Sequence, residues 1–145
     1  MDELQRPGGE LASRPLHFFW VVDCSGSMIS EGKIGIVNNA IQALKESDTK
    51  DPWIEVKTRA SIRTIVREKK YPTAVIISIS NNGPEIPEQI KQTVFFPMVT
   101  TKTHGNGLGL SIALNIIERH HGTIECLSDA QKTVFKIILP LKSRI

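Results

Sequence analysis

The chain has 145 residues, of which 40% are hydrophobic and 23% are charged, values that suit a single soluble globular domain. Its net charge of +3 is small and spread along the chain, so it gives little support to a nucleic-acid partner. Its longest apolar runs are strand-sized, far short of the ~18 residues of a membrane-spanning helix, so no membrane segment is expected.

The N-terminal part is predicted to contain a tail, a strand, a loop and a helix. Residues 1–15 carry scattered charges without an apolar core, which predicts a flexible tail and no signal peptide. Residues 16–22 read LHFFWVV, which is typical of a strand buried on both faces. Residues 24–32 are rich in Ser and Gly and predict a loop. Apolar residues at helical spacing then predict a helix over residues 33–45.

The middle of the chain is predicted to be rich in strands. Residues 54–58 alternate between apolar and polar side chains, which indicates a half-buried strand. Residues 62–66 either continue this strand or return beside it. Residues 67–72 are predicted to form a charged turn, and TAVIISIS over residues 73–80 predicts another strand.

The C-terminal part alternates helix and hairpin. Residues 88–92 suit one helical turn, and residues 108–119 have the apolar periodicity of a helix. Residues 123–127 and 133–139 predict two strands joined by a turn at 128–131. The order of elements favours an α+β two-layer sandwich, in which helices cover one face of a mixed, antiparallel-rich sheet.

The two cysteines, Cys24 and Cys126, are too few for a disulfide framework and lack metal-ligand spacing. A reducing, cytoplasmic location is therefore expected.

A glycine-rich segment, GNGLGL, opens the predicted helix at residue 108. Its glycines allow backbone N–H groups to approach an anion closely, and the helix N-terminus adds partial positive charge. The segment can therefore cradle phosphates, although glycines at this spacing also serve tight turns. The residues concerned are Gly105, Gly107, Leu108, Gly109 and Leu110.

The residues before these glycines add to this pattern. Two aromatic residues, Phe95 and Phe96, can anchor a segment, and the side chains of Thr100, Thr101 and Lys102 can contact phosphates. The whole stretch, FFPMVTTKTHGNGLGLS, resembles the nucleotide lid of the histidine-kinase ATP-binding domain.

Other motifs of that family follow the same order along the chain. NNGPEIP at residues 81–87 stands where the family has DNGPGIP, and NAIQAL at 39–44 resembles its asparagine motif. Residues 120–140 resemble the closing hairpin, and FFPMV with the long hairpin 53–79 looks most like nitrogen-regulatory sensor kinases. The resemblance runs from about residue 33 to 141 and implies a Bergerat-type fold that binds Mg-ATP under the lid.

The resemblance also implies roles for single residues. Asn39 would coordinate the Mg²⁺ that bridges the ATP phosphates, although it also suits an ordinary polar helix position. Asn81 would face the adenine base, and Gly83 would let the backbone pass close to it. The lid residues would complete the cofactor site.

This chain departs from the family at three positions. Asn81 replaces an aspartate that accepts a hydrogen bond from adenine, which predicts weak ATP binding and poor discrimination against GTP. Glu85 replaces a glycine and is expected to crowd the turn, so Glu85→Gly should relax it. Gly35 stands one helical turn before Asn39, where related ATPases that hydrolyse ATP carry a general base.

No phosphoacceptor is evident among the four histidines, which suit structural positions. The dimerisation and phosphoacceptor helix pair of the family is also not recognisable. The resemblance therefore implies a separate phosphoacceptor helical domain and a response regulator as partners. The histidines are His17, His104, His120 and His121.

The segment before the helix has a second resemblance. A strand followed by Asp23, Ser25 and Ser27 resembles the start of a von Willebrand A domain, in which these oxygens would bind a divalent metal. The same residues also suit a polar loop that caps a helix. The alternative function is therefore a metal-dependent interaction module. The predicted divisions are 1–15 (tail), 16–32 (von Willebrand A-like fragment) and 33–145 (ATP-binding domain).

Overall fold

The structure is a computed structural model that describes residues 17–19, 27–99 and 108–141, with side chains described from residue 35 onward. Its elements are β1 (His17–Phe19), α1 (Ser27–Glu46), β2 (Trp53–Val66), β3 (Lys69–Asn81), α2 (Glu88–Lys91), α3 (Gly109–Arg119), β4 (Thr123–Ser128) and β5 (Thr133–Leu141).

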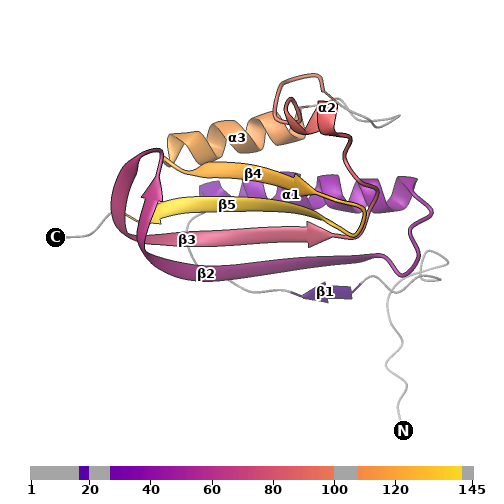
Figure 1. Ribbon diagram of the computed structural model, residues 1–145, viewed down its shortest axis with the longest axis horizontal. Coiled ribbons are helices and arrows are strands. Elements are labelled where there is room, and N and C mark those ends of the chain that lie inside the picture. The colour runs from indigo at the N-terminus through magenta and orange to yellow at the C-terminus, as the bar shows by residue number, and fades with distance from the viewer. Residues whose placement is uncertain (1–16, 20–26, 100–107, 142–145) are drawn as a thin grey trace, which may run out of the picture.

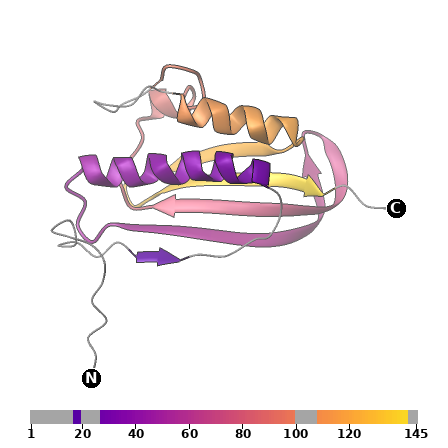
Figure 2. The same ribbon diagram turned by 180° about the vertical axis from the view of Figure 1, so that it is seen from behind.

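The elements form two layers. The sheet has the order β1-β2-β3-β5-β4, in which β1 pairs parallel with β2 and the other neighbours are antiparallel. α1 and α3 lie side by side on one face of this sheet (Figures 1 and 2). The predicted α+β sandwich with helices on one face is thus confirmed.

The core fills the space between the helices and the sheet. α1 contributes buried residues at a spacing of four, which is one helical turn, and α3 contributes a second stripe. The central strands supply the facing hydrophobic residues. The core includes Ile36, Ala40, Leu44, Leu110, Ala113, Ile117, Ile54, Ile77, Ile79, Phe135, Ile137 and Leu139.

The β2–β3 hairpin differs from the sequence-based expectation. β2 continues without a break to Val66, and the turn consists only of Arg67 and Glu68, whose φ angles are 48° and 64°. Positive φ at both central residues is typical of a type I′ hairpin turn, which usually contains Asn or Gly. The predicted turn 67–72 was too long, because its charged residues occupy an exposed extension of β3.

The N-terminal elements also differ from the prediction. α1 begins at Ser27, so the loop predicted for residues 24–32 is wrong over most of its length. Serine and glycine disfavour a helix only weakly, and a helix with a well-packed apolar face overrides that preference. The strand predicted for 16–22 is observed over His17–Phe19, at the edge of the sheet.

Candidate functional site

The helix-facing side of the sheet ends in a row of polar residues. Asn81 on β3 is registered with Thr133 on β5, and Thr133 is registered with Ser128 on β4. Asn81 and Thr133 are each only 3% exposed. Two residues closer to the middle of the sheet on the same strands, the side chains on this face are hydrophobic. The row therefore forms a small buried polar surface at one end of the core.

The turn after β3 is fixed by a hydrogen bond to Asn81. The Gly83 backbone N–H donates to Asn81 Oδ1 at 3.0 Å, in a buried setting. A side chain at position 83 would place its Cβ 2.9 Å from that oxygen and 3.5 Å from Leu44 Cδ2. A larger residue at position 83 would therefore displace the Asn81 side chain, whereas its contact with α1 would be an ordinary one.

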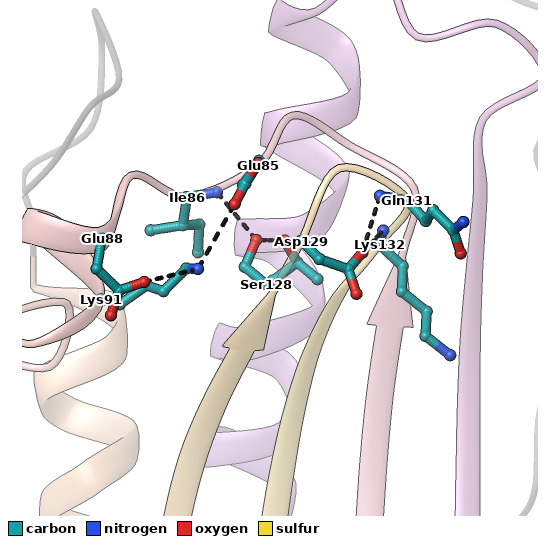
Figure 3. A network of polar contacts seen from close by, with 9 residues as sticks. Glu85, Ile86, Glu88, Lys91, Ser128, Asp129, Gln131 and Lys132 are labelled. Atoms are coloured by element: carbon teal, nitrogen blue, oxygen red, sulfur yellow. Dashed lines mark hydrogen bonds and ion pairs between the residues drawn. The ribbon is translucent and has the colours of Figure 1, made fainter.

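The loop that follows is attached to the polar row by a second contact (Figure 3). The Ile86 N–H donates to Ser128 Oγ at 2.9 Å, and Ser128 Oγ lies 2.6 Å from Thr133 Oγ1. The hydroxyl groups thus satisfy a backbone donor of the loop and each other. Residues 81–86 are held over the end of the sheet at both ends.

Glu85 does not crowd this turn. Its φ is not positive, so the backbone there is one that any residue adopts. Its carboxylate lies 3.6 Å from Lys91 Nζ, and Glu88 approaches the same ammonium at 3.0 Å (Figure 3). The hydrogen bond that Lys91 donates to the Glu88 carboxylate, together with the negative charge of Glu85, raises the pKa of Lys91. The strain that the sequence led us to expect at Glu85 is therefore absent.

α1 connects this polar end to the start of α3. At Gly35 an added Cβ would lie 3.5 Å from Gly109 O, and at Gly83 it would lie 3.8 Å from Ala43 Cβ. Asn39 is half-buried and stands one helical turn from each of these contacts. Eight residues of helix span ~12 Å, so the two contacts are separated by about that distance along α1.

The N-terminus of α3 is suited to an anion. Its first turn has no acidic residue, and its N-cap residue, Leu108, provides no side-chain cap. A helix N-terminus carries partial positive charge, so it favours a negatively charged group. Leu110 is buried in the core whereas Leu108 and Gly109 are exposed. Leu110 thus anchors the helix, and its two predecessors form the accessible end.

Several predicted site residues cannot be placed. Ser27 is the first residue of α1, and its side chain is not described. The remainder lie outside the described residues: Asp23, Ser25, Thr100, Thr101, Lys102, Gly105 and Gly107.

Sequence reasoning missed Ser128 and Thr133. Each is a hydroxyl residue at the end of a strand whose other helix-facing residues are hydrophobic. That pattern was visible, but only the register shows that both lie beside Asn81.

Two absences bear on the possible ligands. Among the described residues, His, Cys, Asp and Glu form no group of three that could bind a metal. A Mg²⁺ ion at Asn39 would therefore take most of its oxygen ligands from phosphates and water, which is common for this ion. In the described part of the chain no helix is long and apolar enough to cross a membrane.

The chain is similar to known proteins over this same region. Residues 35–143 match the family of histidine kinase-, DNA gyrase B- and HSP90-like ATPases. The chain is 38% identical over 114 residues to the sensory histidine kinase/phosphatase NtrB of Salmonella typhimurium, with 79% of this chain and 32% of that protein covered. The chain thus spans about a third of the length of this relative. The match begins at residue 35 and does not support the von Willebrand A resemblance of residues 16–32.

Solved structures agree with this match. The catalytic domain of histidine kinase ThkA has a TM-score of 0.61 at 34% identity, with 79% of this chain and 66% of that chain covered. A complex of ThkA with the response regulator protein TrrA has a TM-score of 0.58 at 31% identity, with 79% of this chain and 28% of that chain covered.

Proposed function

The chain belongs to the family of histidine kinase-, DNA gyrase B- and HSP90-like ATPases, and for its matched region, an ATP-binding domain of the histidine-kinase type, we propose the following mode of nucleotide binding. It binds a Mg-nucleotide between α1, the 81–86 loop and the N-terminus of α3. It serves as the catalytic domain of a two-component sensor kinase.

The geometry of α1 carries this proposal. One face of the helix touches the turn at Gly83 near one end and the start of α3 near Gly35, with Asn39 between them. The polar row at Asn81 and Thr133 would receive the base, and the N-terminus of α3 would receive the phosphates. The separation of the two contacts along the helix suits a nucleoside triphosphate.

Asn39 would act between these two ends. Its amide oxygen is a suitable ligand for Mg²⁺, which when bound neutralises phosphate charge. The lid residues Thr100, Thr101 and Lys102 would add contacts to the phosphates, together with the glycines of residues 105–109. The metal-binding role of Asp23, Ser25 and Ser27 has no comparable support.

The phosphoryl group would pass to a histidine on a separate helical domain and then to a response regulator. In this proposal the described histidines keep the structural roles expected from the sequence: His17 lies in β1, and His120 and His121 lie at the C-terminal end of α3. The solved complex of ThkA with a response regulator is consistent with such a partner. An assay of this transfer needs the separate helical domain that carries the phosphoacceptor histidine.

Isothermal titration calorimetry of the whole chain with Mg-ATP tests the binding step. Asn39→Ala should weaken binding by about tenfold, which corresponds to one charge-assisted contact. Asn38→Ala is the matched control, because Asn38 is the adjacent, exposed residue of the same helix. Equal loss in both variants would contradict the placement of Asn39. Absence of nucleotide binding at millimolar concentrations would contradict the proposed function.

A further inference from the structure

We propose that the base site of this chain prefers a 6-oxopurine, such as guanine or hypoxanthine, over adenine. The proposal rests on the proposed function, in which the base lies at Asn81. It follows from how Gly83 fixes the orientation of the Asn81 side chain, and it goes beyond a weakened adenine site.

The orientation of the Asn81 amide is set by chemistry. The Gly83 N–H is a donor, so the atom 3.0 Å from it must be the amide oxygen. The turn lies beside α1, since a Cβ added at Gly83 would meet Leu44 Cδ2 at 3.5 Å and Ala43 Cβ at 3.8 Å, and the hydrogen bond keeps the Gly83 N–H next to the Asn81 side chain. Reversing the amide would place its NH₂ group against the Gly83 N–H, and a side chain only 3% exposed has little water to separate two donors.

The fixed oxygen leaves the amide NH₂ group as the unused part of Asn81. Within the described residues the Asn81 side chain makes only the hydrogen bond from Gly83. It forms no hydrogen bond with the side chains of its registered neighbours. Ile54 is apolar, and Thr133 Oγ1 is paired with Ser128 Oγ at 2.6 Å. No buried side-chain nitrogen or oxygen of the described residues lacks a hydrogen-bond partner, so the NH₂ group of Asn81 must reach the surface, where an acceptor on a ligand could bind it.

The two classes of purine differ at the atom that would meet this donor. Adenine carries an amino group at position 6, which is a donor, whereas guanine and hypoxanthine carry a carbonyl oxygen, which is an acceptor. A donor from Asn81 therefore pairs with the carbonyl and opposes the amino group. The amide oxygen keeps a second lone pair, so adenine is disfavoured and not excluded.

An aspartate at the same position would have the opposite preference. One carboxylate oxygen would accept the Gly83 N–H, and the other would remain an acceptor for an amino group. The change from aspartate to asparagine thus replaces an acceptor by a donor at a fixed place. We expect Asn81→Asp to reverse the preference between the two purine classes.

Calorimetric titration with Mg-ATP and Mg-ITP tests this inference, because the bases of these nucleotides differ at position 6 and in the protonation of the adjacent ring nitrogen. The native chain should bind Mg-ITP about tenfold more tightly than Mg-ATP. This is the effect expected when the Asn81 NH₂ group donates a hydrogen bond to the carbonyl of ITP but faces the amino group of ATP. Purine riboside triphosphate, which lacks a substituent at position 6, should bind less tightly than ITP. In Asn81→Asp, ATP should bind more tightly than ITP.

Asn82→Asp is the matched control for the added charge. The Asn82 side chain bonds Trp53 N at 2.8 Å and Asp51 O at 3.0 Å, so it is committed to the neighbouring loop. This variant should keep the native preference for ITP. If Asn81→Asp fails to fold, as judged by thermal melting, the native ratio of ITP to ATP affinity still decides the question.

The outcomes separate the inference from the proposed function. Tighter binding of ATP than ITP by the native chain would overturn the preference and leave nucleotide binding in place. An Asn82→Asp variant that reverses the preference as Asn81→Asp does would assign the effect to charge and overturn the role of the Asn81 amide. Failure of both the native chain and a folded Asn81→Asp variant to bind any nucleotide would overturn the proposed function and this inference together.

Discussion

The middle of the helix-facing side of the sheet and its end near Asn81 are built from the same strands but have opposite chemistry. In the middle, residues such as Ile79 and Phe135 are at most 1% exposed and belong to the hydrophobic core. Two residues further towards the end of the sheet, the corresponding residues are Asn81 and Thr133, which are each only 3% exposed but polar. Alternation along a strand places both sets on one face.

This difference separates stability from binding. Burial of apolar side chains is the dominant favourable contribution to folding. A buried polar group contributes little net stability and is unfavourable if it lacks a partner. In the proposed function the polar row contacts the ligand, so substitutions in the two regions should affect different measurements.

The largest expected effect is on stability, in the middle of the sheet. Ile79 is 0% exposed, so Ile79→Ala should lower the free energy of unfolding by ~2–5 kcal/mol through lost burial and the cavity that remains. Urea denaturation measures this change. Nucleotide affinity of the folded fraction should be nearly unchanged. A loss of less than ~1 kcal/mol would show that this position is not part of a tightly packed core.

Cys126 reports on the same region through its reactivity. Burial raises the pKa of the Cys126 thiol from 9.0 to about 11, and Lys91 lowers it slightly. The thiolate is the reactive form, so alkylation at pH 8 should be about a hundredfold slower in the native chain than after unfolding. A Cys24→Ser background leaves one thiol to follow by mass spectrometry. Equal rates in both states would contradict the buried position of the thiol.

At the polar end, a change that preserves shape should affect binding more than stability. Thr133→Val removes a hydroxyl beside Asn81 and should weaken nucleotide binding about tenfold, with ~1 kcal/mol lost from the free energy of unfolding. Thr73→Val, the same change near the other end of β3, should leave affinity unaltered. Similar affinities for both variants would show that the polar row does not contact the ligand.

The smallest effect is expected at Glu85. Its backbone is unstrained and its carboxylate lies near Lys91, so Glu85→Gly should change nucleotide affinity by less than about twofold. The sequence alone suggested an improvement, because the family has glycine there. A tenfold gain in nucleotide affinity, measured by calorimetry, would contradict this prediction and support the improvement expected from the sequence.

The sequence predicted the order of elements because the apolar periodicity of each segment reflects the face it buries. It also predicted site roles for Asn39, Asn81 and Gly83 from recognisable motifs, and these roles stay predictions. It did not identify Ser128 and Thr133, because their proximity to Asn81 depends on register between strands that are distant in sequence. The turn at Arg67 and Glu68 was predicted too long, over residues 67–72, because neither residue type is usual at positive φ and the two-residue turn was not recognisable.

The central claim is that the polar end of the sheet and the start of α3 form one nucleotide site. Hydrogen–deuterium exchange with and without saturating Mg-ATP or Mg-ITP, resolved by peptide, tests it most directly. Residues 79–87 and 109–114 should exchange more slowly with nucleotide, whereas the hairpin tip at residues 62–70 should be unchanged. Protection of the hairpin tip without protection of residues 79–87 would contradict the account.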